Sequence, residues 1–225
     1  MQVKVYSCVK CVGDDFIKYG KTNYGKQRYQ CKFCKAISVL QYSYNAYKKD
    51  INTKVIQLTK ESMGIRSIAR ILKISTTTLL KRIVAIADNI GQPLIPYYQT
   101  YELDEMRFFI RKKSNVMWLV YAINKSTKEI AGFYIGRRNN KTLNAVIKTL
   151  INSKAKKIYT DKLRNYQYLI LKEIHSTKRH GINRIERKNL SIRTHVKRLN
   201  RKTICFSRSA VILNAILKIY FWSDS

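Results

Sequence analysis

The chain has 225 residues, of which 45 are lysine or arginine and 13 are aspartate or glutamate, so its formal net charge is +32. Self-repulsion at this charge disfavours a compact state unless a polyanion neutralises it, so we expect nucleic acid as the partner. The 45% hydrophobic content excludes a disordered chain, and the sequence has no apolar run of 18 residues and no single basic amphipathic helix. We therefore expect no membrane partner.

The N-terminal residues MQVKVYSCVK lack the apolar core of a signal peptide, so we expect a cytoplasmic protein with reduced cysteines. Two C-x2-C pairs with nineteen residues between them predict one tetrahedral, structural Zn²⁺ in a zinc-ribbon module at residues 1–42, too small to fold without the metal. The alternative is four unrelated thiols or a redox pair. Cys205 is expected to be a small buried hydrophobe. The predicted zinc ligands are Cys8, Cys11, Cys31 and Cys34.

Between the two cysteine pairs, residues 18–29 (KYGKTNYGKQRY) alternate basic residues with tyrosines and contain two glycines. This composition predicts a hairpin that faces phosphates and stacks rings on bases or sugars. A solvated hairpin with no such contacts is the alternative.

A helical module is predicted at residues 43–92, where apolar residues recur at helical spacing, Gly64 interrupts the pattern and Ser75 is placed to cap a third helix. The run SIARILKISTTTLLKRI resembles a DNA-binding helix-turn-helix. Lys73 stands where such turns often have glycine, so it would have to adopt a positive φ. The alternative is an ordinary three-helix packing unit. The predicted DNA contacts are Thr76, Thr77, Thr78, Lys81 and Arg82.

Both prolines lie in a linker at residues 91–100, and residues 97–225 read as a mixed α/β domain compatible with a ribonuclease-H-like fold. Three consecutive strands are predicted to form an antiparallel meander, followed by a helix, a fourth strand and more helices. The predicted strands are 101–113, 116–124, 129–136 and 155–161, with turns at 113–115 and 124–128 and helices at 141–151, 164–174 and from about 186 to about 199.

Three carboxylates stand out in this domain. Asp104 shares the strand face of apolar residues, where a charge needs a strong partner such as a metal, whereas Glu105 points to the opposite face. Asp161 ends the fourth strand, so the two aspartates meet if that strand lies beside the first. Glu186, on a helix packed over that edge, would complete an all-oxygen site for two Mg²⁺ ions.

The region around Glu186 is rich in basic residues. Arg193 and Lys197 follow it at helical spacing, so they are predicted to share its face and to contact DNA phosphates. On these residues alone, the alternative is that the three acids only balance neighbouring lysines and arginines.

The segments DEMRFFIRKKSNVMWLVYAIN, YTDKLRNY, NRIERKNLSIRTHVKRLNRKTICFSRS and GKQRYQCKFC resemble the insertion-sequence-one family of bacterial transposases. The resemblance implies a zinc finger and helix-turn-helix that bind the element's terminal inverted repeats, and a ribonuclease-H-like domain with a D, D, E triad. The triad falls on Asp104, Asp161 and Glu186, with 24 residues between the last two. The resemblance also implies that the protein forms a dimer or larger assembly on DNA. It further implies a location in the bacterial cytoplasm, at the nucleoid.

The sequence therefore predicts a DNA transposase that cuts the 3′ ends of its element and joins them to target DNA. Three alternatives stay open: a transcriptional regulator built from the first two modules, a nuclease without strand transfer, and a decayed, inactive copy of the transposase. The family commonly has tryptophan at the position of Arg107, and a decayed copy would show departures of this kind.

Overall fold

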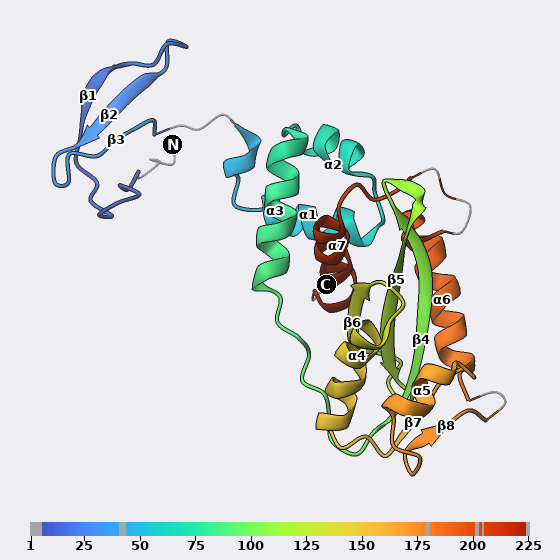
Figure 1. Ribbon diagram of the computed structural model, residues 1–225. Helices are drawn as coiled ribbons and strands as arrows, with labels where there is room; N and C mark the ends of the chain where they lie inside the picture. The colour runs from blue at the N-terminus through green and yellow to red at the C-terminus, as the bar shows by residue number, and fades with distance from the viewer. Residues whose placement is uncertain (1–5, 41–43, 179–180, 201–202, 204, 224–225) are drawn as a thin grey trace. The chain divides into compact units, whose positions relative to one another are not determined.

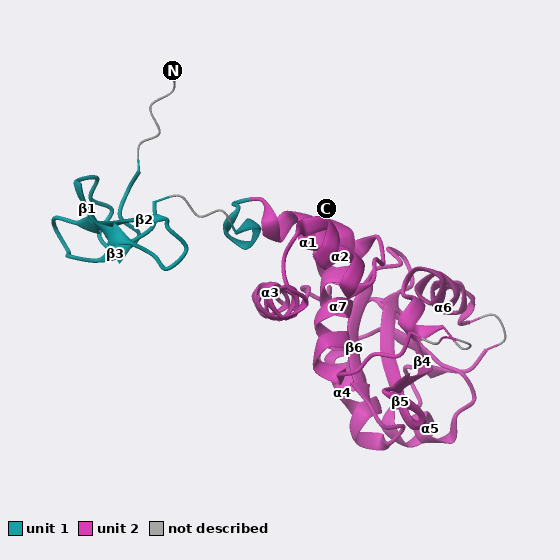
Figure 2. Ribbon diagram, turned by 90° about the horizontal axis from the view of Figure 1, so that it is seen from above, with its two compact units in different colours: residues 1–49 teal, residues 50–225 magenta. Residues whose placement is uncertain are grey.

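The computed structural model describes residues 6–40, 44–178, 181–200, 203 and 205–223. These residues fall into two units, one within residues 1–49 and the other within residues 50–225 (Figure 2). The predicted boundary between residues 42 and 43 lies outside the described residues. In the described part of the chain, no helix is both long and apolar enough to cross a bilayer.

The first unit contains a three-stranded antiparallel sheet. Its strands are β1 (Phe16–Lys21), β2 (Gln27–Cys31) and β3 (Ile37–Ser38), in the order β1-β2-β3, and a short 3₁₀ helix, η1 (Asn45–Tyr47), follows. Gly20 and Gly25 have positive φ, which allows the irregular register near the end of β1 and the tight turn before β2. The predicted hairpin between the cysteine pairs is confirmed.

The second unit begins with three helices, α1 (Ile51–Lys60), α2 (Ile65–Leu72) and α3 (Thr76–Asn89). The Ser75 side chain accepts a hydrogen bond from the Thr78 backbone N–H at 3.0 Å, so the predicted cap of α3 is confirmed. Lys73, between α2 and α3, has φ 53° and ψ 46°, which confirms the predicted positive φ. A left-handed residue at the end of α2 turns the chain sharply enough for α3 to begin three residues later.

The C-terminal helix α7 (Ala210–Trp222) packs against α1 and α3. Lys218 on α7 donates to the Ala87 carbonyl near the end of α3 at 3.3 Å, and Lys60 at the end of α1 donates to the Ser223 carbonyl at 2.9 Å. Each lysine therefore satisfies a carbonyl at the C-terminal end of another helix, where a positive charge is favoured. The sequence prediction left α7 unassigned.

The second unit contains a five-stranded sheet in the order β6-β5-β4-β7-β8 (Figure 1). β4, β5 and β6 form the predicted antiparallel meander, β7 lies parallel to β4, and β8 lies parallel to β7. The expectation that the fourth strand lies beside the first is confirmed. The strands are β4 (Thr100–Ile110), β5 (Lys112–Asn124), β6 (Ile130–Gly136), β7 (Lys157–Tyr159) and β8 (His175–Ser176).

Helices cover both faces of this sheet, which therefore has two cores. Side chains of β4 point alternately into the two cores. Leu103 packs with residues of α4 and the α5 region, whereas Met106 packs with residues of α6, η2 and α7. The remaining helices of the unit are α4 (Asn140–Asn152), α5 (Arg164–Leu169), α6 (Asn183–His195) and η2 (Lys197–Leu199).

The turn predicted at residues 113–115 is wrong. These residues belong to β5, and the chain reverses at Arg111, which has φ 62°. Its backbone N–H donates to the Ser207 carbonyl at 2.8 Å and its Nε donates to the Arg208 carbonyl at 3.0 Å. Contacts with a segment far along the chain therefore fix a turn that local composition did not indicate.

Two predicted helices are too long and one burial prediction is wrong. The helix predicted at 164–174 ends at Leu169, and β8 follows. The helix predicted to reach about residue 199 ends at His195, because Val196 leaves the helical region with ψ 81°. Cys205 is exposed instead of buried.

Replacing Lys73 by glycine should raise the free energy of unfolding of the second unit by about 0.5 kcal/mol, because glycine adopts the left-handed conformation without the steric penalty of a side chain. Both tryptophans lie in this unit, so urea unfolding followed by their fluorescence reports on it. Lys73→Ala keeps the penalty and serves as the control. A destabilised Lys73→Gly variant would show that the turn is not left-handed in solution.

Candidate active site and zinc site

The four cysteines of the first unit converge. The Sγ atoms of Cys8 and Cys34 are 3.5 Å apart, as are those of Cys11 and Cys31, and all four lie within 4.8 Å of one another. Tetrahedral Zn–S bonds of about 2.3 Å require S–S separations of roughly 3.8 Å, so this donor set fits one Zn²⁺. Backbone N–H groups of Lys10 and Cys11 lower the pKa of Cys8 to about 6, which favours the thiolate that a metal binds.

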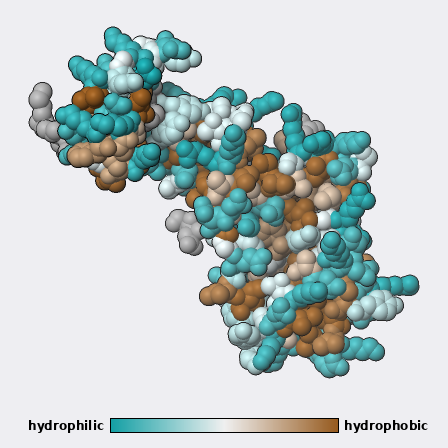
Figure 3. Space-filling model, turned by 60° about the vertical axis from the view of Figure 1, so that its left-hand side comes forward, coloured by the Kyte–Doolittle hydropathy of each residue, from teal (hydrophilic) through white to brown (hydrophobic). Residues whose placement is uncertain are grey.

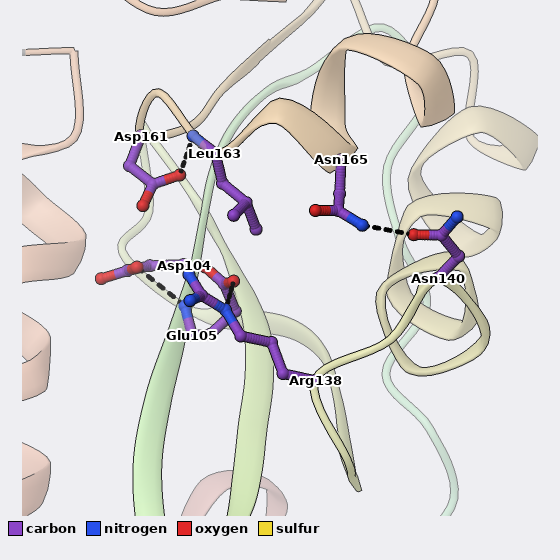
Figure 4. A network of polar contacts seen from close by, with 7 residues as sticks. All are labelled: Asp104, Glu105, Arg138, Asn140, Asp161, Leu163 and Asn165. Carbon is purple, nitrogen blue, oxygen red and sulfur yellow. Dashed lines mark hydrogen bonds and ion pairs between the residues drawn. The ribbon is translucent and has the colours of Figure 1, made fainter.

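Three carboxylates converge in the second unit. One oxygen each of Asp104, Glu105 and Asp161 lies within 4.8 Å of the others (Figure 4). β7 pairs with β4 only as far as Glu102, so β4 continues without a strand partner on that side. Asp161 follows two residues after β7 ends and lies beside this open edge. We call these three residues the acidic cluster.

Asp104 is held by two hydrogen bonds. Its Oδ1 accepts from the Glu105 backbone N–H at 2.7 Å, and its Oδ2 accepts from Asn189 Nδ2 on α6 at 2.6 Å. Asn189 Oδ1 in turn accepts from the Tyr121 hydroxyl at 2.8 Å, which fixes the amide orientation. Burial raises the pKa of Asp104 to about 6, because the two hydrogen bonds only partly offset the desolvation of the charged form.

The sequence prediction left Glu105 out of the metal ligands. Strand alternation places it on the opposite face from Asp104, yet the open edge of β4 lets both carboxylates approach Asp161. Its side chain is 1% exposed and its Oε1 accepts from Arg138 Nε at 3.1 Å. The Arg138 guanidinium also lies over the Trp118 ring at 4.6 Å. Burial raises the pKa of Glu105. In the sequence, the only sign of this role is that Glu105 is adjacent to Asp104 on the same strand.

Asp161 is held by its own loop. Its Oδ1 accepts from the Leu163 backbone N–H at 3.0 Å, and the preceding Thr160 hydroxyl contacts His175 Nε2 on β8 at 2.8 Å. A short turn that satisfies its own backbone therefore fixes the carboxylate. The side chain is half-buried and faces the other two acids (Figure 4).

Glu186 is exposed in the first turn of α6 and does not belong to the acidic cluster of the described residues. It lines a hollow of about 380 Å³ together with Asn189, which contacts Asp104. In the described part of the chain, the predicted convergence thus joins the two aspartates but does not include Glu186, which is linked to them through the hollow that it shares with Asn189. The hollow is lined by Glu186, Asn189, Leu190, Arg193, Thr194 and Asn200.

Of the two basic residues predicted beside Glu186, Arg193 lines the same hollow and donates to the Leu199 carbonyl at 2.8 Å. Lys197 is exposed but lies in η2, beyond the end of α6, so helical periodicity no longer places it on the face of Glu186. The helical spacing on which the predicted shared face rests therefore does not extend to Lys197.

The residues predicted to contact DNA from α3 differ in exposure. Thr76, Thr77 and Lys81 are exposed, whereas the Thr78 hydroxyl contacts that of Ser75 at 2.8 Å. Arg82 Nη1 donates to Asn52 Oδ1 on α1 at 2.8 Å, so this arginine links α3 to α1. A second hollow, of about 490 Å³, lies between α2 and the start of α3. It is lined by Arg66, Ala69, Arg70, Lys73, Ile74 and Thr76.

The carboxylates of the acidic cluster suit a metal cation, and the many basic side chains of the chain suit phosphate groups. Carboxylate oxygens within 4.8 Å of one another are a donor set that fits Mg²⁺. On the face drawn in Figure 3, hydrophilic side chains project between apolar patches. Since lysine and arginine outnumber the acids 45 to 13, most charged side chains of the chain are cations suited to phosphates.

A mixed sheet with helices on both faces fits the ribonuclease-H-like domain of a transposase. A family model described as IS1 transposase matches residues 99–223, and the chain belongs to this family. The predicted resemblance is therefore confirmed.

Two relatives show the extent of the similarity. The insertion element iso-IS1n protein InsB of Shigella dysenteriae is 36% identical over 116 residues, which cover 52% of this chain and 88% of that protein. The insertion element IS1 protein InsB of Shigella flexneri is 29% identical over 119 residues, which cover 53% of this chain and 91% of that protein. Similarity thus extends over most of each relative.

Among solved structures, a chain in the cryo-electron microscopy structure of the simian T-cell lymphotropic virus intasome in complex with PP2A regulatory subunit B56 gamma is similar at a TM-score of 0.40. The identity is 14%, and the alignment covers 72% of this chain and 66% of that chain.

Replacing Cys31 by serine should lower the zinc content of the purified protein from one ion per chain to well below one, because three thiolates bind the ion less tightly. Metal analysis and trypsin digestion check this, and residues 6–40 should become sensitive to digestion while the second unit stays resistant. Cys205→Ser is the control, since Cys205 lies outside the four-cysteine group. An unchanged zinc content in the Cys31→Ser variant would contradict the assignment.

The affinity of the zinc-loaded protein for Mn²⁺ should fall about tenfold for each pH unit below roughly pH 6, because Asp104 must lose its proton to bind a cation and its pKa is about 6. Ordinary aspartates would retain affinity to about pH 4. Titration of free Mn²⁺ by electron paramagnetic resonance measures this. A constant affinity between pH 4.5 and 7 would show that Asp104 is either ionised throughout or not a ligand.

Proposed function

We propose that the protein catalyses metal-dependent cleavage of DNA at the 3′ ends of its insertion sequence, followed by transfer of those ends to target DNA. One observation carries the proposal: in a chain of the IS1 transposase family, Asp104 and Asp161 bring their carboxylates within 4.8 Å of each other and of Glu105. A transcriptional regulator has no use for such a group.

Asp104 and Asp161 would hold two Mg²⁺ ions, with Glu105 near enough to supply a further oxygen and Glu186 approaching from α6. When bound, such ions activate the attacking oxygen and stabilise the leaving oxygen of an in-line displacement. Asn189, itself held by the Tyr121 hydroxyl, orients Oδ2 of Asp104, and the Glu105 backbone N–H orients Oδ1. Arg138 limits the negative charge of the cluster when the ions are absent.

The DNA around the reacting phosphate would lie along the hollow that Glu186 and Arg193 line. Phosphate oxygens flanking the reacting one would be contacted by Arg193 and by the exposed Lys197. In this arrangement the basic residues hold the backbone and the carboxylates perform the chemistry.

Recognition of the terminal inverted repeats is proposed for the helix-turn-helix of α2 and α3, because Thr76, Thr77 and Lys81 are exposed at the start of α3. The arginines that line the neighbouring hollow would contact backbone phosphates. The zinc ribbon adds a basic hairpin in which Arg28 lies over the Tyr19 ring at 5.9 Å. We also propose that two or more copies pair the two ends of the element.

Replacing Asp161 by asparagine should abolish cleavage of DNA that carries the element's end, a loss of at least about a thousandfold, while the affinity for that DNA changes little. The amide keeps the size of the side chain and its acceptor for the Leu163 N–H, so the loop should fold normally. Gel assays with Mg²⁺ measure cleavage and binding separately. Asp88→Asn, at an exposed position on α3, is the matched control.

The alternatives give other outcomes in the same assays. Cleavage that survives in the Asp161→Asn variant would refute the catalytic site. If the wild-type protein binds ends but cuts nothing, it is a regulator or a decayed copy. Supplying pre-nicked ends with Mg²⁺ and target DNA tests the last step, because a nuclease without strand transfer gives no joined product.

A further inference from the structure

Glu102 is a fully buried carboxylate that belongs to neither the acidic cluster nor the predicted triad. It lies two residues before Asp104 on the same face of β4 and is 0% exposed. Its Oε2 accepts from the Ile185 backbone N–H at 2.8 Å. Ile185 is in the first turn of α6, where N–H groups have no partner within the helix and a negative charge is favoured.

Lys125, just beyond β5, supplies the opposite charge. Its Nζ lies 3.6 Å from Glu102 Oε1, donates to the Gly181 carbonyl at 3.1 Å, and lies 3.9 Å from the centre of the Tyr159 ring. One ammonium group therefore contacts β4, β7 and the segment that leads into α6. A buried carboxylate with an ion pair and a backbone donor is far less costly than an unpaired one.

Gly181 brings that segment close to β7. A Cβ atom at this position would lie 2.5 Å from Tyr159 Cδ1 and 2.9 Å from the Lys178 carbonyl oxygen. Neither distance permits a side chain, so the backbone itself packs against the last residue of β7. Glu102, Lys125, Tyr159, Gly181 and the Ile185 N–H form one contact group, which we call the α6 anchor.

The α6 anchor adjoins all three residues of the predicted triad. Asp104 follows Glu102 by two residues, Asp161 follows Tyr159 by two, and Glu186 follows Ile185 directly. Of these three residues, Glu186 is the one carried by the first turn of α6, to which the anchor is bonded directly through the Ile185 N–H.

We propose that Glu102, paired with Lys125, is a positioning residue that sets the first turn of α6 so that Glu186 reaches the cation held by Asp104 and Asp161. This rests on the proposed function in one respect only, the role of Glu186 as a cation ligand. Glu102 itself touches neither substrate nor cation, and acts through the Ile185 N–H.

Mn²⁺ affinity measured without DNA tests this coupling. Glu102→Leu should weaken Mn²⁺ binding by about tenfold or more, the effect expected for residues that orient metal ligands. Glu186→Gln should weaken it by a similar factor. Because Glu102 acts through Glu186, the double variant should bind Mn²⁺ no more weakly than the more affected single variant.

Two further variants distinguish loss of the hydrogen bond to the Ile185 N–H from a general loss of stability. Glu102→Gln retains an oxygen that can accept from the Ile185 N–H, so it should keep most of the affinity. If the leucine variant does not fold, Lys125→Met, which removes the other half of the ion pair, takes its place in the double-variant test. Ser209→Ala removes the hydroxyl that accepts from the Ile212 N–H at the start of α7. It destabilises the same unit without touching the α6 anchor, so its Mn²⁺ affinity should match that of the wild type.

The proposal is overturned if the losses for Glu102→Leu and Glu186→Gln multiply in the double variant, or if either single variant binds Mn²⁺ like the wild type. The first result would mean that Glu102 contributes only to general stability. Cleavage assays separate this from the proposed function, since a wild-type protein that cuts no DNA can still show the coupling in Mn²⁺ binding.

Discussion

The candidate active site depends on a difference in length between two neighbouring strands. β4 runs from Thr100 to Ile110, whereas β7 pairs with only its first three residues. Beyond that point, one edge of β4 has room for side chains instead of a strand. Asp104 and Glu105 would be separated by the sheet in a fully paired strand, and here both reach the same loop. Every other feature of the site is arranged around this edge.

The acids of this edge are stabilised by specific polar partners in a chain that is otherwise cationic. Asp104 has Asn189 and a backbone N–H, Glu105 has Arg138, and Asp161 has the backbone of its own loop. Only Arg138 is a cation, and it also stacks on an aromatic ring. Neutral donors orient a carboxylate without cancelling its charge, so the cluster keeps negative charge available for cations even though the chain carries a net charge of +32.

Local patterns in the sequence predicted much of this structure. Cysteine spacing indicated the four-thiolate group, runs of aromatic and β-branched residues separated by polar turns indicated the meander, and the position of Lys73 indicated a left-handed residue. Features set by distant contacts were missed. α7 is almost uniformly apolar, so its sequence shows no amphipathic face to indicate what it packs against. Alternation places Glu105 on the face opposite Asp104, but it does not show that Asp161, beyond the end of the shorter neighbouring strand, lies within reach of carboxylates from both faces.

The packing of α7 has a consequence for how the protein is made. α1 and α3 precede the five-stranded sheet in the chain, yet both contact α7, which follows it. Lys60 of α1 is hydrogen-bonded to Ser223, which lies 163 positions later, and Ala87 of α3 is hydrogen-bonded to Lys218, which lies 131 positions later. A ribosome has synthesised almost the whole second unit before these partners emerge, and contacts of such long range form late. During translation, the helices proposed to recognise DNA are therefore exposed without the helix that supports them, and they acquire their final packing only after α7 has been synthesised.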